Sequence, residues 1–169
     1  MVVNLQEIRT AVLTYVDTKV TCSVSAIIPD VPIALSPSEG FTFNVTVSNA
    51  AVAAGGIRLT NVRYVISASS SNVKLIVPPV TVGNARVIGL LPLALNPGTE
   101  TSGYILTPPA GDLKILDPGE TDTITGLKGI AKSLGAFSVC FHILADIDLD
   151  FLFPQDAPSV NGCKPGNVV

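Results

Sequence analysis

Acidic residues stand at every second position near the C-terminal end of the chain: Asp146, Asp148 and Asp150. Residues two apart in a β-strand lie on the same face, about 6.5–7 Å from each other. Ca²⁺ prefers carboxylate oxygens, so this row is a candidate calcium site. The alternative is a solvated face whose charges are offset by Lys114, Lys128 or Lys132 across the strand. Strand spacing favours the alternative, because three such carboxylates cannot all reach one ion.

Thiol chemistry is the second candidate, because the chain has three cysteines: Cys22, Cys140 and Cys163. An odd number leaves at least one thiol outside any disulfide within the chain. Residue alternation places Cys22 on the apolar face of its strand and Cys140 on the polar face of another. We therefore expect Cys140 to pair with Cys163, which lies in a Gly- and Asn-rich segment. Three reduced thiols are the alternative.

His142 is the only histidine and lies two residues from Cys140, on the same face of a strand. A nucleophile and its base need contact near about 3 Å, whereas strand neighbours two apart are separated by more than twice that distance. We interpret His142 as a surface or interface residue. The sequence contains no Gly-x-Ser-x-Gly, His-Glu-x-x-His or paired Cys-x-x-Cys motif, and we predict that the protein is not an enzyme.

These residues belong to one long alternating segment. From Phe137 to Phe151 every second residue is apolar, which predicts a β-strand. Typical strands have about 5–6 residues, so we expect this one to have spare length that pairs with a neighbouring subunit. Outward-facing Leu144 and terminal Phe151 are candidate assembly residues.

The N-terminal segment predicts a helix over about residues 5–16, with an extra strand as the alternative. Asn4 and Glu7 have the spacing of a capping pair. Apolar residues recur at helical spacing, and those we expect in assembly are Leu5, Ile8, Val12 and Tyr15. This stripe packs either on the protein's own sheets or on a neighbouring subunit.

The remaining sequence predicts short strands separated by turns. Residues 41–48 alternate cleanly, whereas residues 57–66 alternate only if a β-bulge lies near Asn61. About eight strands indicate an all-β, immunoglobulin-like antiparallel β-sandwich. The predicted organisation is an N-terminal helix or arm (1–19), the sandwich (20–153) and an irregular C-terminal tail (154–169).

Several short segments have the pattern of one known family: residues 45–49, 61–64, 116–121 and 135–139. They resemble prokaryotic immunoglobulin-like surface modules, especially CARDB-type adhesion repeats. In that family a strand ends in Asn, as at Asn49, and a Pro-Gly turn, as at Pro118–Gly119, introduces the last strand pair. The resemblance spans about residues 40–150. It implies a sandwich used for adhesion or as a spacer, without catalytic residues.

The composition indicates the kind of surface that the protein has. Only 14% of its residues are charged, compared with about 25% in an average soluble domain. Such a surface is typical of extracellular sandwiches and of subunits in larger assemblies. The net charge of -3 and the scattered Lys and Arg residues give no electrostatic reason to bind nucleic acid. No apolar stretch is long enough for a membrane span, and the first residues do not resemble a signal peptide.

We therefore predict a non-enzymatic structural or adhesion subunit that binds itself or a surface in an extracellular assembly, such as a filament or surface layer. One alternative is a virion decoration or tail protein, with other virion proteins as partners. Another is a Ca²⁺- or glycan-binding module. The absence of Trp and the presence of only three Tyr leave few side chains for stacking on sugars.

Overall fold

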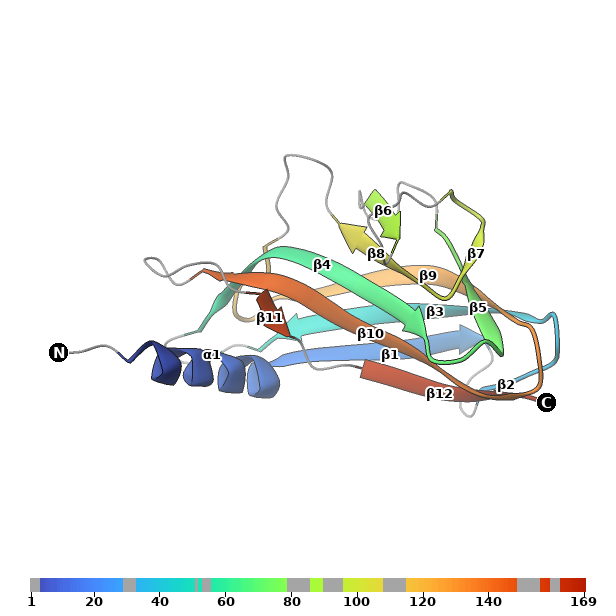
Figure 1. Cartoon of the computed structure of the whole chain (residues 1–169), viewed down its shortest axis with the longest axis horizontal. Coiled ribbons are helices and arrows are strands. Elements are labelled where there is room, and N and C mark those ends of the chain that lie inside the picture. The colour runs from blue at the N-terminus through green and yellow to red at the C-terminus, as the bar shows by residue number, and fades with distance from the viewer. Residues whose placement is uncertain are drawn as a thin grey trace.

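The described residues fold into two β-sheets packed face to face, with one helix, α1 (Leu5–Lys19), before the first strand (Figure 1). The computed structural model describes residues 4–28, 33–50, 52, 56–78, 86–89, 96–107, 115–148, 156–158 and 162–169. This architecture confirms the predicted antiparallel β-sandwich. None of the helical residues described forms a segment with the length and hydropathy needed to cross a membrane.

Within the described residues, the smaller sheet (sheet A) has five antiparallel strands in this order: β1 (Val20–Ile28), β3 (Gly40–Asn49), β9 (Thr121–Ala131), β5 (Val73–Ile76) and β7 (Glu100–Thr101). The larger sheet (sheet B) has seven described strands. Six lie in this order: β2 (Ile33–Leu35), β12 (Gly162–Val168), β10 (Gly135–Asp148), β4 (Arg58–Ala68), β8 (Gly103–Thr107) and β6 (Arg86–Gly89). The seventh, β11 (Asp156–Pro158), also pairs with β10. Neighbours in sheet B are antiparallel apart from β2 and β12, which run parallel.

The predicted helix is confirmed and continues to Lys19. The Asn4 side chain caps it by accepting a hydrogen bond from the backbone N–H of Gln6 at 3.0 Å. Val12 and Val16 are buried in the same core as the two sheets, and Ile8 packs against that core. The chain itself therefore covers most of the apolar stripe that the sequence offered for assembly.

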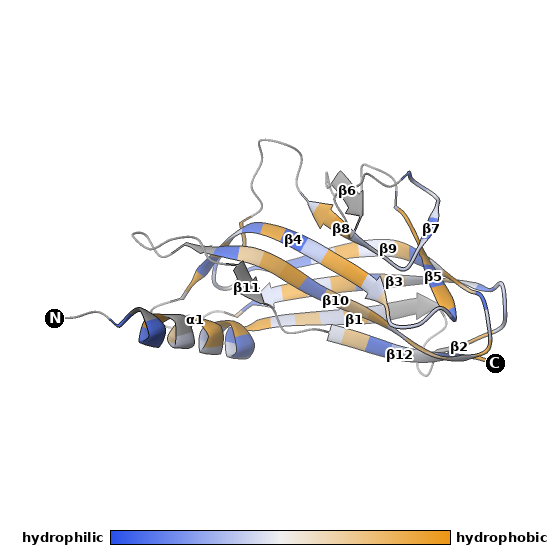
Figure 2. Cartoon of the chain, in the orientation of Figure 1, coloured by the Kyte–Doolittle hydropathy of each residue, from blue (hydrophilic) through white to orange (hydrophobic). Residues whose placement is uncertain are grey.

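The core forms where the inward faces of the two sheets meet. Along β3 every second side chain is buried, and so is every second side chain of β10 from Phe137 to Ala145. Figure 2 shows hydrophobic stretches broken by hydrophilic bands along β4 and β10. The Phe41 ring of β3 lies 5.9 Å from the Phe137 ring of β10, centroid to centroid. Such tilted aromatic contacts between sheets are favourable beyond the area that they bury.

The β-bulge predicted near Asn61 is confirmed. Asn61 has a positive φ of 48°, and the register of β4 against β10 shifts at this point, between the pairs Arg63–Leu144 and Thr60–Asp146. The inserted residue restores the alternation, so that Val62 and Leu59 are both buried.

Two predictions about the C-terminal third are wrong. The sequence predicts an irregular tail over 154–169, whereas the structure has strands β11 and β12 there. Their Gly, Pro and Asn residues are poor strand formers, and pairing with β10 and β2 overrides that preference. The sequence also predicts spare backbone on the last long strand. Instead the described part of this strand, β10, is an interior strand, with β4 on one side and β12 and β11 on the other. The last residues of the predicted strand, 149–151, lie outside the described residues.

Candidate interaction surface

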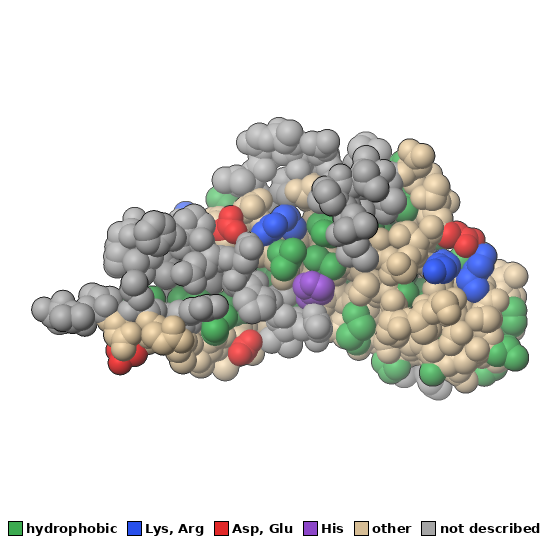
Figure 3. All heavy atoms as spheres, viewed as in Figure 1, with side chains coloured by type: hydrophobic (Ala, Val, Ile, Leu, Met, Phe, Trp, Pro, Cys, Tyr) green, Lys and Arg blue, Asp and Glu red, His purple; other side chains and the backbone are tan. Residues whose placement is uncertain are grey.

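The outer face of sheet B carries three apolar side chains and one histidine, which we call the outer patch: His142, Leu144, Val65 and Ile105. Alternation along β10 turns His142 and Leu144 away from the core. His142 is paired in register with Val65 of β4, and Val65 with Ile105 of β8. The patch therefore runs across three neighbouring strands. Figure 3 shows the histidine with hydrophobic side chains beside it on this face.

The outer patch is unusual for the exposed side of a sandwich, where polar side chains normally alternate with buried ones. Val65 is only 6% exposed, and the other three residues are half-buried. Burial lowers the pKa of His142 below its ordinary value, so its imidazole is neutral at pH 7. A neutral imidazole costs less to bury than a charged one, which suits a contact surface.

Polar side chains border the outer patch at one end. The carboxylate of Asp146 accepts a hydrogen bond from the Asn61 side-chain amide at 3.2 Å, and Nη2 of Arg63 lies 3.9 Å from its other oxygen. Arg63 is paired with Leu144 in register, so this charged group adjoins the patch directly. The outer patch thus has apolar side chains and, at one end, a polar rim, and protein interfaces combine the same two features.

The calcium prediction remains a prediction. The structure brings Asp146 to the outer face of β10, but Asp150 and the side chain of Asp148 lie outside the described residues. Among the residues that are described, no three His, Cys, Asp or Glu side chains form a cluster able to hold a metal ion. Asp146 is instead accompanied by Arg63 and Asn61.

The lysines expected to offset this acidic row lie elsewhere or are not described. Lys132 forms an ion pair with Glu100 at 2.9 Å, and Lys128 lies on β9 in the other sheet. Lys114 lies outside the described residues. Sequence spacing identified the need for a cation but not the strand that supplies Arg63.

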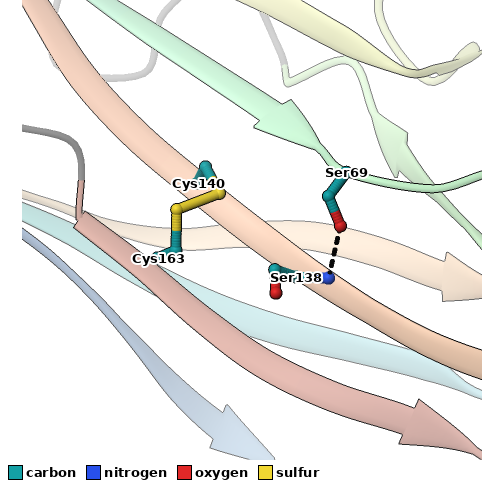
Figure 4. Close-up of a disulfide and its surroundings, with 4 residues drawn as sticks. All are labelled: Ser69, Ser138, Cys140 and Cys163. Atoms are coloured by element: carbon teal, nitrogen blue, oxygen red, sulfur yellow. Dashed lines mark hydrogen bonds between the residues drawn. A yellow bond between two sulfur atoms is a disulfide. The ribbon is translucent and has the colours of Figure 1, made fainter.

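Cys140 and Cys163 form a disulfide, and they are the two cysteines that the sequence analysis paired (Figure 4). They are directly opposite each other on β10 and β12, with their Cα atoms 4.1 Å apart. On the other side of β10, Ser138 donates its backbone N–H to the Ser69 hydroxyl at 2.8 Å. Cys22 of β1 lies outside this disulfide and packs against the core.

The remaining predicted assembly residues divide into two groups. Ile8 and Val12 of α1 contact the protein's own core, and the Tyr15 hydroxyl donates a hydrogen bond to Oδ1 of Asn49, at the end of β3, at 3.0 Å. Phe151 and the side chain of Leu5 lie outside the described residues. Leu144 is the predicted residue that the structure places on an outward face.

The outer face of sheet A contrasts with the outer patch. Most of its outward side chains on β1, β3 and β9 are uncharged hydroxyl and amide groups: Thr21, Ser23, Ser25, Thr42, Asn44, Thr46, Ser48, Thr121 and Thr123. Lys128 and Ile130 of β9 lie on the same face. Hydroxyl pairs bond across strands, with Thr46 and Thr123 at 3.0 Å. Beyond them lies a depression of about 330 Å³. It is lined by Gly40, Phe41, Thr42, Ile76, Lys128, Gly129 and Ile130.

Asn49 explains why two of the family-like segments occur together. Its side-chain amide donates to the carbonyl of Leu116 at 3.1 Å and to the carbonyl of Ile57 at 2.9 Å. Its backbone N–H donates to Glu120, and its carbonyl accepts from Gly119. The end of β3 and the Pro-Gly turn are therefore held together by one buried residue, which gives both segments an architectural role.

Comparisons with known proteins give neighbours in fold only. No family model and no curated protein matches the chain. A chain of the Coh-OlpC–Doc435 type I cohesin–dockerin complex of Clostridium thermocellum is similar at a TM-score of 0.48 and 11% identity, over 91% of this chain and 97% of that one. AvmM, which catalyses macrocyclization in alchivemycin A biosynthesis, is similar at a TM-score of 0.46 and 13% identity, over 90% and 89% of the two chains. These values are too low to transfer an activity or a partner, and the resemblance to CARDB-type repeats stays a prediction.

Proposed function

We propose that this chain is a non-enzymatic structural or adhesion subunit that associates with copies of itself through the outer patch of sheet B. The observation that carries this proposal is the register row His142–Val65–Ile105, with Leu144 beside it, on an outward face. Val65 is already buried, so a second copy would remove from water the exposed parts of His142, Leu144 and Ile105, at a gain of about 25 cal/mol per Å² of apolar surface buried.

The chemistry of the patch suits contact with an identical surface. In a two-fold contact the same patch faces itself, so its centre must tolerate its own side chains. His142 is neutral at pH 7 because burial lowers its pKa, so two copies meet without imidazolium repulsion. The rim contributes one cation, Arg63, and one anion, Asp146, from each copy.

The disulfide supports an extracellular location. Disulfides form and persist in oxidising compartments and are rare in the cytosol, where thiols are kept reduced. The low fraction of charged residues, 14%, supports the same assignment. Both properties are typical of a subunit that works outside the cell in an assembly.

Light scattering after size exclusion tests the proposal on the disulfide-intact protein over a range of concentrations. The wild type should show a mass above that of a monomer as concentration rises. Leu144→Gln keeps the side chain near its size but makes it polar, and it should weaken association about tenfold, as expected for a loss of about 1.4 kcal/mol.

Ser25→Gln is the matched control, because Ser25 is exposed on β1 in the opposite sheet. It should associate like the wild type, and thermal melts should show that both variants remain folded. A wild type that stays monomeric at every concentration would overturn the proposal. Equal weakening by both substitutions would overturn the placement of the contact on sheet B.

A further inference from the structure

We propose that β12 is an exchangeable strand: Gly162–Val168 of one copy docks on β10 of a second copy, and the Cys140–Cys163 disulfide then joins the two chains. This inference rests on the proposed function, self-association, but it uses a different surface. The occupant of that surface is the C-terminal strand of another copy, and the contact is a covalent link between subunits.

Packing alone holds β12 weakly. Of its seven residues, Val168 is the one that is buried, and the others alternate between half-buried and exposed. Two Gly, one Pro and one Asn lower its strand propensity further. Elements with little buried apolar surface open at a small fraction of the global unfolding free energy. The strand ladder and the disulfide therefore carry most of the attachment of β12.

The edge of β10 that β12 covers can pair with a strand along its whole length. Residues Gly135–Phe141 of β10 pair with β12 in an unbroken antiparallel register. Within the described strands, β2 pairs with β12 alone, so both strands depend on the same attachment. A β12 from another copy has the identical sequence and makes the same ladder. Exchange of an identical element is a low-cost route to association.

The cysteine pair can close within one chain or between two. Cys163 is exposed and Cys140 is half-buried on the outer face, so we expect a small thiol reagent to reach the disulfide. A dithiol supplies two electrons and two protons, the S–S bond breaks to two thiols, and the dithiol becomes a disulfide. On reoxidation, oxidised glutathione accepts two electrons and two protons as Cys140 bonds to whichever Cys163 is docked opposite.

The register makes this link a specific reporter of exchange. Cys163 lies opposite Cys140 only when β12 occupies its native position on β10. A chain that lacks Cys163 can therefore bond through Cys140 efficiently only if a β12 from elsewhere takes that position. Docking would hold the two sulfurs together at a high effective concentration.

Two variants made in a Cys22→Ser background test the proposal: Cys140→Ser and Cys163→Ser. Each has one thiol, so neither can close its own disulfide. The two are mixed, oxidised with glutathione disulfide, and analysed by non-reducing gel and by mass spectrometry of the linked peptides. We expect a Cys140–Cys163 heterodimer that exceeds either homodimer about tenfold, because docking raises the effective concentration of the pair. A heterodimer no more abundant than the homodimers would overturn the proposal.

A second measurement keeps the test valid if a variant folds poorly. The full wild-type chain is reduced with dithiothreitol at high concentration, dialysed against oxidised glutathione, and compared with untreated protein. Disulfide-linked dimers that retain a native circular dichroism spectrum support exchange, and complete return to monomer overturns it. Repeating this experiment with Leu144→Gln distinguishes self-association through the outer patch from exchange of β12. Contacts through the outer patch dissociate in detergent, whereas exchanged strands remain covalently linked.

Discussion

The Tyr64 hydroxyl of β4 donates a hydrogen bond to a carboxylate oxygen of Asp122 on β9, and this bond crosses from sheet B to sheet A. Asp122 is paired in register with buried Val47, so its side chain is directed toward the core rather than toward solvent. Tyr64 is only 6% exposed. A carboxylate on the inner face of a sheet needs such a donor, because a buried charge without a partner is costly.

Replacing Tyr64 with Phe should destabilise the protein by about 1.5–3 kcal/mol, the usual value of a hydrogen bond to a charged group. The ring would keep its packing against Phe141, whose ring centroid lies 5.7 Å away. The loss of stability would therefore come from the missing hydroxyl. Urea unfolding monitored by circular dichroism measures this difference.

Tyr104→Phe is the matched control. Tyr104 is fully buried on β8, and its hydroxyl has no hydrogen-bond partner among the residues that the structure describes. Removing a buried polar group of this kind is expected to leave stability unchanged or to raise it. A loss at Tyr104 as large as that at Tyr64 would contradict the role assigned to the Asp122 bond.

Stability should fall steeply in alkali because of the same two tyrosines. Burial, then the hydrogen bond to Asp122 and its negative charge, and the Coulomb effect of Cys22 raise the pKa of Tyr64. Burial alone raises the pKa of Tyr104. In the unfolded chain both ionise near pH 10, so above that pH the folded state holds more protons. The stabilisation is therefore complete below about pH 10 and decreases as the pH rises further. Unfolding free energies measured from pH 8 to 11.5 should show this fall, and the two Phe variants should show a shallower one.

Asn49→Asp should cost about 3–5 kcal/mol, as expected for a buried charge without compensation. The substitution places an oxygen where the amide now donates to the carbonyls of Ile57 and Leu116. Thermal and urea unfolding measure the effect. Asn44→Asp controls for the change of residue type, because the Asn44 side chain accepts a hydrogen bond from the Gly126 N–H and a carboxylate can do the same. Equal effects at both sites would exclude a special role for Asn49.

Gly162→Ala should destabilise the attachment of β12 by about 1–3 kcal/mol, as in overpacked sites. A Cβ at this position would overlap the carbonyl group of Cys22 and lie 2.8 Å from the Cα of Ser23, and both are backbone atoms of β1 that cannot rotate away. Hydrogen exchange of β12 amides should become faster. Gly40→Ala, where the nearest atom would be 3.8 Å away, should leave those rates unchanged.

Local sequence patterns were sufficient to predict several elements of the structure. The alternation of residues 41–48 corresponds to β3, and the irregular alternation of residues 57–66 located the bulge at Asn61. Helical spacing located α1, although its stripe proved to face the core. Residue alternation also placed Cys22 on the apolar face of its strand and Cys140 on the polar face of another. This left Cys163 as the expected disulfide partner of Cys140, and the structure shows that disulfide. In each case the information lies in residues close together in the chain.

Tertiary structure alone decided which strands are neighbours. The sequence of β10 looks the same whether the strand is an edge or, as here, an interior strand, because the ladder uses backbone groups that every residue has. The Gly- and Pro-containing β12 became a strand because β10, β2 and a disulfide hold it. The sequence by itself determined which side chains of each strand face the core, since alternation is local. Only the tertiary structure decided that Tyr64 meets Asp122 and that Val65 and Ile105 lie beside His142, since such contacts depend on strand order and register between distant segments.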